Sequence, residues 1–452
     1  MPNNELIPSE ERIYNWIEKV FAHGIRRPGY PADRWAEQFC LEQFQGFGLE
    51  DVRLEPVRLP YWEPRRWSLA ISSDSGTHEI DCFPLPHAAP TAGVEARLVE
   101  YDNTSPEGVR GAVALFDVQL NRPPHTRLAE LATWCYDPEG TFAETRQVLP
   151  FGRDVQGVME PSMAAGAVAF VGTLSDYPSD SHDYYVPYDA LERPIPGVWV
   201  RGSDGERLRA LMEREPVRAR IEVDSVREEI TSYNVVGELP GANDETVIVG
   251  SHHDGPWASA VEDGSGIALV LAQASYWSRV PREERPHRLV FLLNAGHMAG
   301  GAGAKAFIKA HAAELDRVLL EIHLEHSAVE CTEESGRLVP TGHPEARWWF
   351  TSRNPELEAS VRGAIEAEDL ARSLIMPPTA FGTQPTTDGG AFHIAGVPLV
   401  NFLTAPFYLF DSQDTMDKIH RPSLVPVTRA AIRIIEDTAG GTAEGVRAGI
   451  AS

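Results

Sequence analysis

The chain has 452 residues, 42% of them hydrophobic, and its 40 basic and 66 acidic residues give a formal net charge of −26. This length exceeds what one hydrophobic core usually holds, so we expect two to three domains of about 100–200 residues each. The acidic excess argues against nucleic acid or an anionic membrane surface as a partner.

The cysteines and the N-terminus indicate a cytoplasmic protein. The four cysteines lie far apart and form no CxxC pair, which predicts free thiols and no cysteine-based zinc site. The opening MPNNELIPSEERIYNWIEKVF has neither the basic nor the apolar region of a signal peptide. No stretch approaches about 18 consecutive apolar residues, so we expect no membrane partner.

The first 90 residues predict two helices and a strand. Ser9 can cap a helix whose apolar side chains follow the helical spacing up to the stop at Gly24, and a second helix is expected from about Pro31. The apolar positions of these helices are Ile13, Trp16, Ile17, Val20 and Phe21, then Trp35, Phe39 and Phe44. The following VRLEPVRL (52–59) is typical of a strand.

The middle of the chain predicts a smaller α/β unit. The runs GAVALFDV (111–118) and GAVAFVGT (166–173) are short strands opened by glycine, and PIPGVWVRGSDGERLRALME (194–213) is typical of strand, turn and helix. We therefore divide the chain into 1–90, an inserted unit at 91–228, and 229–452.

From Ile230 onward, continuous apolar strands alternate with helices, which predicts an α/β domain with a mixed, mostly parallel sheet sandwiched by helices. Ligands bind outside the carboxyl ends of the strands in such sheets. Three strand ends carry polar groups. They are His252, His253 and Asp254 after VIVGS, His297 after RLVFLLNAG, and Glu325 and His326 after EIHL.

Four of these side chains have the chemistry of metal ligands. His252, Glu262, His297 and Glu325 are nitrogen and oxygen donors at strand ends and a helix start, so we expect them to converge on a divalent metal ion. This donor set favours zinc, with manganese, iron or nickel as alternatives. Each residue taken singly has a structural alternative, and Glu262 with Asp263 could simply be favourable charges at a helix N-terminus.

Six motifs give the C-terminal half a family resemblance. Between Ile230 and Arg433 they occur in the order NVVGELPG with VIVGSHHD, EDGSGIALVL, RLVFLLNAGHMAGGAGAKAFI, EIHLEHS, TTDGGAFHIAGVPLVNF and DTMDKIH. This half resembles the co-catalytic zinc aminopeptidases, a family that includes relatives of glutamate carboxypeptidase and glutaminyl cyclase. The inserted unit resembles a protease-associated domain through AGAVAFV and IPGVWVRGSDGERL. The resemblance implies a zinc-exopeptidase-like sheet with a smaller α/β insert.

The resemblance implies residue roles and also shows where this chain departs from the family. His252 matches the first metal ligand, and Asp254 matches the aspartate that orients it. Glu262 stands in place of the bridging aspartate and Glu325 in place of a ligand aspartate, so each keeps a carboxylate on a longer side chain. Gly296 with His297 stands where the family has two glutamates, a general base and a ligand.

The last family ligand is also absent, because Phe410 stands where a histidine is expected. Since phenylalanine cannot bind a cation, we predict one metal ion rather than two, held by His252, Glu262 and Glu325 with His297 as a fourth ligand. His393 or His420 could replace the lost ligand, although a structural role is favoured for both.

The missing glutamate at Gly296 leaves the general base open among His253, His297, His326 and Asp388, with His297 or His326 favoured. We expect His253, Trp257 and Asp388 to contact substrate. Trp257 and the run Phe407, Tyr408 and Phe410 could wall an apolar pocket, or could belong to the core.

The sequence therefore predicts a metal-dependent hydrolase of an amide or related C–N bond, acting on a specialised small-molecule or short peptide-like substrate. A metal-dependent lyase or transferase on the same fold, and a non-catalytic relative, are the alternatives. A homodimer is left open.

Overall fold

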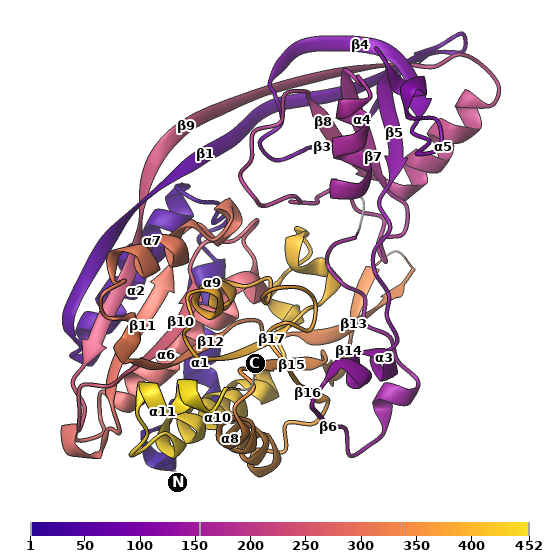
Figure 1. Ribbon diagram of the computed structural model, residues 1–452. Coiled ribbons are helices and arrows are strands. Elements are labelled where there is room, and N and C mark those ends of the chain that lie inside the picture. The colour runs from indigo at the N-terminus through magenta and orange to yellow at the C-terminus, as the bar shows by residue number, and fades with distance from the viewer. Residues whose placement is uncertain (1, 153–154, 336, 451–452) are drawn as a thin grey trace.

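The computed structural model describes residues 2–152, 155–335 and 337–450, and a mixed β-sheet runs through its main domain (Figure 1). Its strands lie in this spatial order: β9 (Arg218–Leu239), β11 (Arg288–Asn294), β10 (Thr246–His252), β12 (Val318–Leu324), β17 (Leu399–Thr404), β15 (Arg347–Thr351), β16 (Ser373–Met376) and β6 (Trp134–Tyr136). The pairs β10–β11, β10–β12, β12–β17 and β15–β16 are parallel, whereas β9–β11, β17–β15 and β16–β6 are antiparallel.

Helices cover both faces of this sheet, which confirms the predicted fold class. The helices of the main domain include α1 (Glu10–Phe21), α2 (Pro31–Phe47), α6 (Gly266–Trp277), α7 (Ala302–Ala310), α8 (Pro355–Ala367), α9 (Asp388–Ile394), α10 (Leu424–Asp437) and α11 (Ala443–Ala448). Alternate β10 side chains point to opposite faces, so Val247 and Val249 pack in the cluster that contains α6, while Ile248 packs with Phe307 and Phe392 of α7 and α9.

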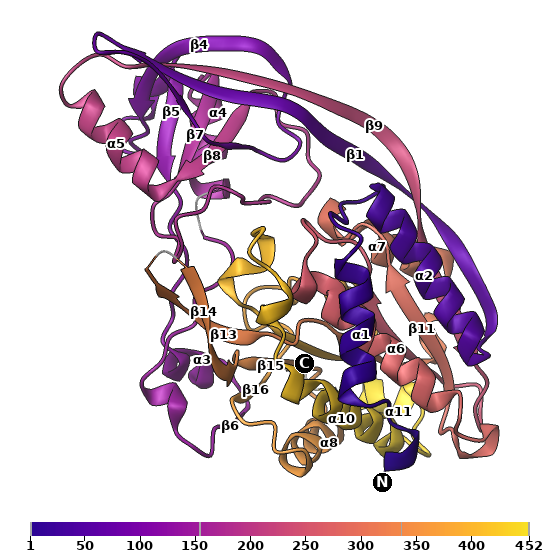
Figure 2. The same ribbon diagram turned by 180° about the vertical axis from the view of Figure 1, so that it is seen from behind.

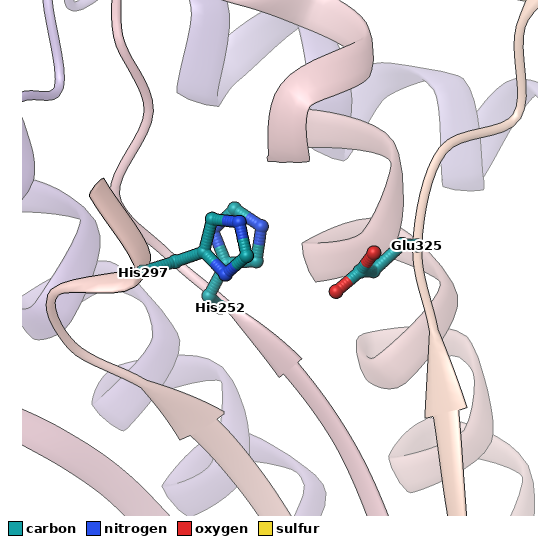
Figure 3. Close-up of side chains that lie close together, drawn as sticks. All are labelled: His252, His297 and Glu325. Atoms are coloured by element: carbon teal, nitrogen blue, oxygen red, sulfur yellow. The ribbon is translucent and has the colours of Figure 1, made fainter. Parts of the chain in front are cut away.

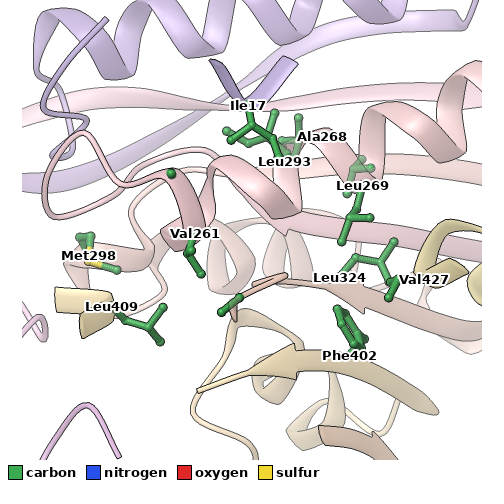
Figure 4. Close-up of a cluster of buried hydrophobic side chains, with 14 of the residues drawn as sticks. Ile17, Val261, Ala268, Leu269, Leu293, Met298, Leu324, Phe402, Leu409 and Val427 are labelled. Atoms are coloured by element: carbon green, nitrogen blue, oxygen red, sulfur yellow. The ribbon is translucent and has the colours of Figure 1, made fainter. Parts of the chain in front are cut away.

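The larger core lies on the α6 face. There α1, α6 and α10 pack their apolar sides over the buried residues of β11, β12 and β17 (Figure 4). Ser9 accepts the Arg12 N–H at 3.3 Å and begins α1, as predicted. In α2 the predicted core residues Phe39 and Phe44 are buried, whereas Trp35 is only half-buried.

A second, smaller sheet lies at the other end of the molecule. It contains β3 (Phe83–Pro84), β8 (Gly197–Arg201), β7 (Ala169–Leu174), β5 (Val113–Asp117) and β4 (Thr91–Glu100), with α4 (Glu160–Ala164) and α5 (Gly202–Met212). Two long antiparallel strands, β9 and β1 (Glu50–Ser73), join it to the main sheet along one side of the molecule (Figures 1 and 2). The short strand β2 (Gly76–Ile80) pairs with the end of β1.

The chain between β5 and β7 leaves this smaller unit and returns to the main domain. It forms α3 (His125–Leu131) and then β6, which pairs with β16 at the edge of the main sheet. A separate hairpin, β13 (Val329–Glu334) and β14 (Arg337–Pro344), follows β12. None of the helices in the described ranges is both long and apolar enough to cross a lipid bilayer.

One buried arginine fixes the loop that follows β10. The fully buried Arg26 donates hydrogen bonds to four backbone carbonyls, those of His253, Ala258, Ser259 and Glu262. Buried carbonyls need hydrogen-bond donors, and this side chain supplies them to four carbonyls of an irregular loop. It thereby ties the segment before α2 to the loop that carries Glu262.

We predict that Arg26→Met destabilises the protein by about 3 kcal/mol. Each buried carbonyl left without a donor costs roughly 1–3 kcal/mol, and rearrangement of the surrounding chain recovers part of the total. Arg34→Met, an identical change at an exposed position of α2, is the control. Denaturant unfolding followed by fluorescence measures both variants. Equal midpoints for the two would contradict this role of Arg26.

Candidate metal centre

The three predicted strand ends meet at one place. His252 ends β10, His297 begins the short turn η7 (His297–Ala299) after β11, and Glu325 directly follows β12. The two imidazole rings are stacked, with centroids 4.1 Å apart and planes at 11°. The Glu325 carboxylate faces them across a gap, and one donor atom from each of the three residues lies within 4.8 Å of the others (Figure 3).

Both histidines turn Nε2 toward this gap, and the Nδ1 atom of each faces a hydrogen-bond acceptor on the other side. His252 Nδ1 lies 3.0 Å from the Asp254 carbonyl oxygen, and His297 Nδ1 lies 3.1 Å from Asp388 Oδ1. These partners are acceptors, so each Nδ1 carries the proton and each Nε2 keeps a free lone pair. A metal-binding histidine usually donates the N–H of its other ring nitrogen to such an acceptor.

Glu262 supplies a carboxylate oxygen beside both rings. Its Oε1 lies 3.4 Å from His252 Nε2 and 3.9 Å from His297 Nε2. The backbone position is fixed because the N–H groups of Val261 and Glu262 both donate to the Asp414 carboxylate at 2.8 Å. The neighbouring Asp263 accepts the Gly266 N–H of α6 through Oδ1 at 2.9 Å, while its Oδ2 lies 3.8 Å from His252 Nε2. Glu262 therefore faces the site, while the helix-start alternative describes Asp263.

These atoms fit a divalent metal ion. His252 Nε2 and Glu262 Oε1 are fully buried and have no hydrogen-bond partner among the described residues. Leaving such groups unpaired is costly, and a cation would satisfy both. The converging ligand atoms form two overlapping groups, His252 with His297 and Glu325, and His252 with Glu262 and His326. Imidazole nitrogens together with carboxylate oxygens are a mixed donor set that suits zinc.

Asp254 positions both histidines, but not in the way the resemblance implies. Its carboxylate accepts the N–H groups of His297 and Met298 at 3.0 and 2.8 Å and so fixes η7. Its contact with His252 is made through the backbone carbonyl, since Asp254 Oδ1 is 3.8 Å from His252 Nδ1.

His326 lies on the other side of Glu262. Its Nε2 is 2.5 Å from Glu262 Oε2 and 4.0 Å from Glu325 Oε2, and its Nδ1 donates to the Thr404 carbonyl at 2.8 Å. Burial opposes the charged imidazole, but the Glu262 carboxylate outweighs it and raises the pKa of His326 to about 10. A cation shared with Glu262 would weaken this pairing and lower that pKa again.

Two buried residues that the sequence analysis missed support Glu325. His323 Nε2 lies 2.9 Å from Glu325 Oε1, and His323 Nδ1 lies 2.8 Å from Glu321 Oε1. The three side chains occupy alternate positions along the end of β12, so they share one face of the sheet. The signal was present in EIHLE, where polar residues recur at every second position of an otherwise apolar strand. The contact between His323 and Glu325 uses Oε1 and leaves Oε2 of Glu325 free.

Several other predicted residues lie outside this centre. His253 Nδ1 lies 2.8 Å from Asp33 Oδ1 of α2, and its Nε2 lies 2.9 Å from the Tyr233 carbonyl oxygen. Burial opposes the charge of His253, but Asp33 raises its pKa to about 9. His253 thus faces α2, and both of its ring nitrogens have partners there rather than in the group around His252.

Trp257 is likewise not a wall of the site. Its Nε1 donates to the Phe410 carbonyl at 3.0 Å, and its ring lies 4.6 Å from the Arg27 guanidinium carbon. His420 Nδ1 lies 2.6 Å from Ser423 Oγ. Within the described chain, neither His393 nor His420 belongs to a group of converging ligand atoms, so neither replaces the lost ligand.

A side chain at the first of the two changed family positions would be strained, and the second position is part of an aromatic stack. Gly296 has φ +69°, and a Cβ there would lie 2.7 Å from Leu59 Cδ2. Phe410 stacks on Tyr188 with centroids 4.7 Å apart, and Tyr188 stacks on His297 at 5.5 Å. An aromatic column thus occupies the side of His297 where a further ligand is absent.

We predict that His323→Gln lowers zinc affinity by about 10- to 100-fold, because residues that hydrogen-bond to ligands typically contribute this much. Glutamine can donate to Glu325 or accept from a neighbour, but it cannot bridge both carboxylates. Competition with a chromophoric chelator measures the affinity, and His78→Gln on the exposed strand β2 is the matched control. Unchanged affinity in His323→Gln would show that Glu325 does not need this support.

Comparisons with known proteins agree with this fold. Residues 234–435 match the model of peptidase family M28. Carboxypeptidase Q of Mus musculus is 24% identical over 350 residues, which cover 74% of this chain and 66% of that protein. The alignment with a probable leucine aminopeptidase 2 of Aspergillus oryzae is 28% identical and covers 58% of this chain and 51% of that protein.

Solved structures share the fold over nearly the whole chain. A peptidase M28 precursor from Shewanella amazonensis superposes with a TM-score of 0.71 at 22% identity, covering 95% of this chain and 93% of that one. The zinc aminopeptidase BSAP of Bacillus subtilis gives 0.68 at 18% identity, with 97% and 98% covered. The match to peptidase family M28 thus covers the part of the chain that carries the ligand candidates His252, Glu262, His297 and Glu325.

Proposed function

We propose that the protein is a metal-dependent hydrolase of an amide or related C–N bond that uses one divalent ion, with zinc favoured. The observation that carries this proposal is the pair of stacked histidines whose Nε2 atoms face the same two carboxylates in a buried site. We assign His252, His297 and Glu325 as ligands, with Glu262 as the fourth through Oε1. The family match and the zinc aminopeptidase fold support the assignment.

The amide carbonyl would bind beside these ligands with water on the side of His326. A bound divalent ion supplies a Lewis acid that polarises the carbonyl and lowers the pKa of a water molecule toward about 7. The water oxygen forms a bond to the carbonyl carbon, and the C–N bond breaks. One proton of the water passes to the leaving nitrogen.

His326 is the group best placed to carry that proton. Its Nε2 faces Glu262 and the cavity, while its Nδ1 is held by the Thr404 carbonyl. His297, the other favoured candidate, has Nδ1 engaged by Asp388 and Nε2 directed at the ligand group, so neither nitrogen is available. Asp388 acts on His297 rather than as a base of its own. The geometry therefore favours His326 over His297 as the general base.

One prediction of the proposed function concerns the metal content of the protein. We expect one zinc ion per chain and loss of hydrolysis after chelation, with recovery when zinc is returned. In His252→Ala the bound zinc should fall below about a tenth of an equivalent, because a three- or four-ligand site rarely survives the loss of one ligand. Elemental analysis and circular dichroism measure metal and fold, with His78→Ala as the control. Hydrolysis that persists without metal would overturn the proposal.

Another prediction of the proposed function tests whether His326 carries a proton or binds the metal. His326→Gln should keep its zinc and lose about 10²- to 10⁴-fold in kcat, the range for removing a general acid–base group. His297→Gln should instead lose metal affinity. If His326→Gln lost zinc as severely as His252→Ala, His326 would be a ligand and the base would have to be sought elsewhere.

Product analysis distinguishes hydrolysis from the other reactions that this fold could support. A hydrolase releases a free amine and a carboxylate that contains oxygen from labelled water. A lyase or a cyclising transferase incorporates no such oxygen. A protein that binds no metal and releases no product from any amide would be the non-catalytic relative.

A further inference from the structure

A cavity of about 280 Å³ opens directly onto the metal-site candidates. Among the residues that line it are Glu262, His297, Glu325 and His326. The remaining walls come from distant parts of the chain. They include Leu149, Phe151 and Tyr188 from the inserted segments, Trp348 and Phe350 from β15, and Phe381 and Phe410.

We infer that this cavity binds an uncharged, ring-bearing group on one side of the scissile bond, so that the substrate is an amide without a free charged terminus at that end. The inference rests on the proposed function and names its substrate class.

The first argument is the shape and chemistry of the walls. Six phenylalanine, tyrosine and tryptophan side chains are among the residues that line the space, with Trp348 and Phe350 at right angles to each other and Tyr188 stacked on Phe410. Aromatic walls of this kind favour a flat ring through offset or edge-to-face contacts. Cavities of about 150 Å³ already hold a benzene ring, so 280 Å³ accommodates a ring with a few attached atoms.

The second argument is charge. Among the described residues that line the cavity there is no lysine or arginine, so a substrate carboxylate would find no cationic partner among them. The two acidic side chains are Glu262 and Glu325, and both already face histidines. A substrate ammonium would have to compete for these proposed ligands. A charged terminus would therefore lose its water without a free counter-charge, which is costly.

The third argument is the contrast with the space next door. A larger, open groove of about 660 Å³ shares Tyr188, His297 and Thr387 with the cavity. Unlike the cavity, it includes Lys305 and Asp189. The groove thus offers charged side chains on the other side of His297, so a charged half of a substrate fits the groove while the ring fits the cavity.

Three amides of glycine test the inference in the zinc-loaded protein. N-benzoylglycine places an uncharged ring next to the bond, phenylalanylglycine adds an ammonium beside the ring, and N-acetylglycine removes the ring. N-acetylbenzylamine places the ring on the amine side instead. We expect at least a tenfold higher kcat/KM for one of the uncharged ring compounds than for both phenylalanylglycine and N-acetylglycine. Equal or faster cleavage of phenylalanylglycine would overturn the inference.

A binding measurement keeps the inference testable if none of these amides is cleaved, an outcome that would count against the proposed function alone. Benzyl alcohol and benzylamine have similar size and differ in charge at neutral pH. Calorimetry should show at least tenfold tighter binding of the alcohol. Equal binding, or tighter binding of benzylamine, would overturn the inference.

Filling the cavity provides the matched variant. Ala405 lines it, so Ala405→Leu should weaken benzyl alcohol binding at least tenfold, while Ala210→Leu on the exposed side of α5 should not. If Ala405→Leu lowers the melting temperature, Leu403→Phe is the second filling variant. Unchanged binding in a folded filling variant would place the ligand elsewhere.

Discussion

The site depends on holding one carboxylate, that of Glu262, in a buried position among three imidazoles. Burial alone disfavours the charged form, so the carboxylate must be paired on every side. His326 pairs with Oε2, a cation held with His252 and His297 would pair with Oε1, and the backbone of Glu262 is fixed by Asp414 and Arg26. Because these anchors come from the two ends of the chain, the site forms only when the whole main domain has folded.

Much of this arrangement follows from the sequence. Apolar strands that end in polar residues predict a parallel sheet with a site at its carboxyl edge, and His252, His297 and Glu325 meet there. What local patterns do not contain is the partner of each side chain. His253 looks like a site residue because it adjoins His252, but the strand period turns its side chain to the opposite face. There its Nδ1 contacts Asp33 of α2. The Asp33 contact spans 220 residues, so no sequence spacing could indicate it.

The departures from the family pattern are consistent with one another. A Cβ at Gly296 would lie 2.7 Å from Leu59 Cδ2, and Phe410 continues the ring stack that starts at His252 and passes through His297 and Tyr188. A side chain at position 296 would therefore need a strained backbone and a shift of Leu59. The same aromatic residues that displace ligands also wall the cavity, so the loss of a ligand and the gain of an apolar binding surface have one structural cause.

X-ray absorption at the zinc edge of the loaded protein tests the central claim most directly, because it counts ligands and detects a second metal. The account predicts one zinc environment with two imidazole nitrogens and carboxylate oxygens at about 2.0–2.2 Å. A zinc–zinc distance of about 3.5–4 Å, as in two-metal hydrolase sites, or an ion without imidazole ligands, would contradict it.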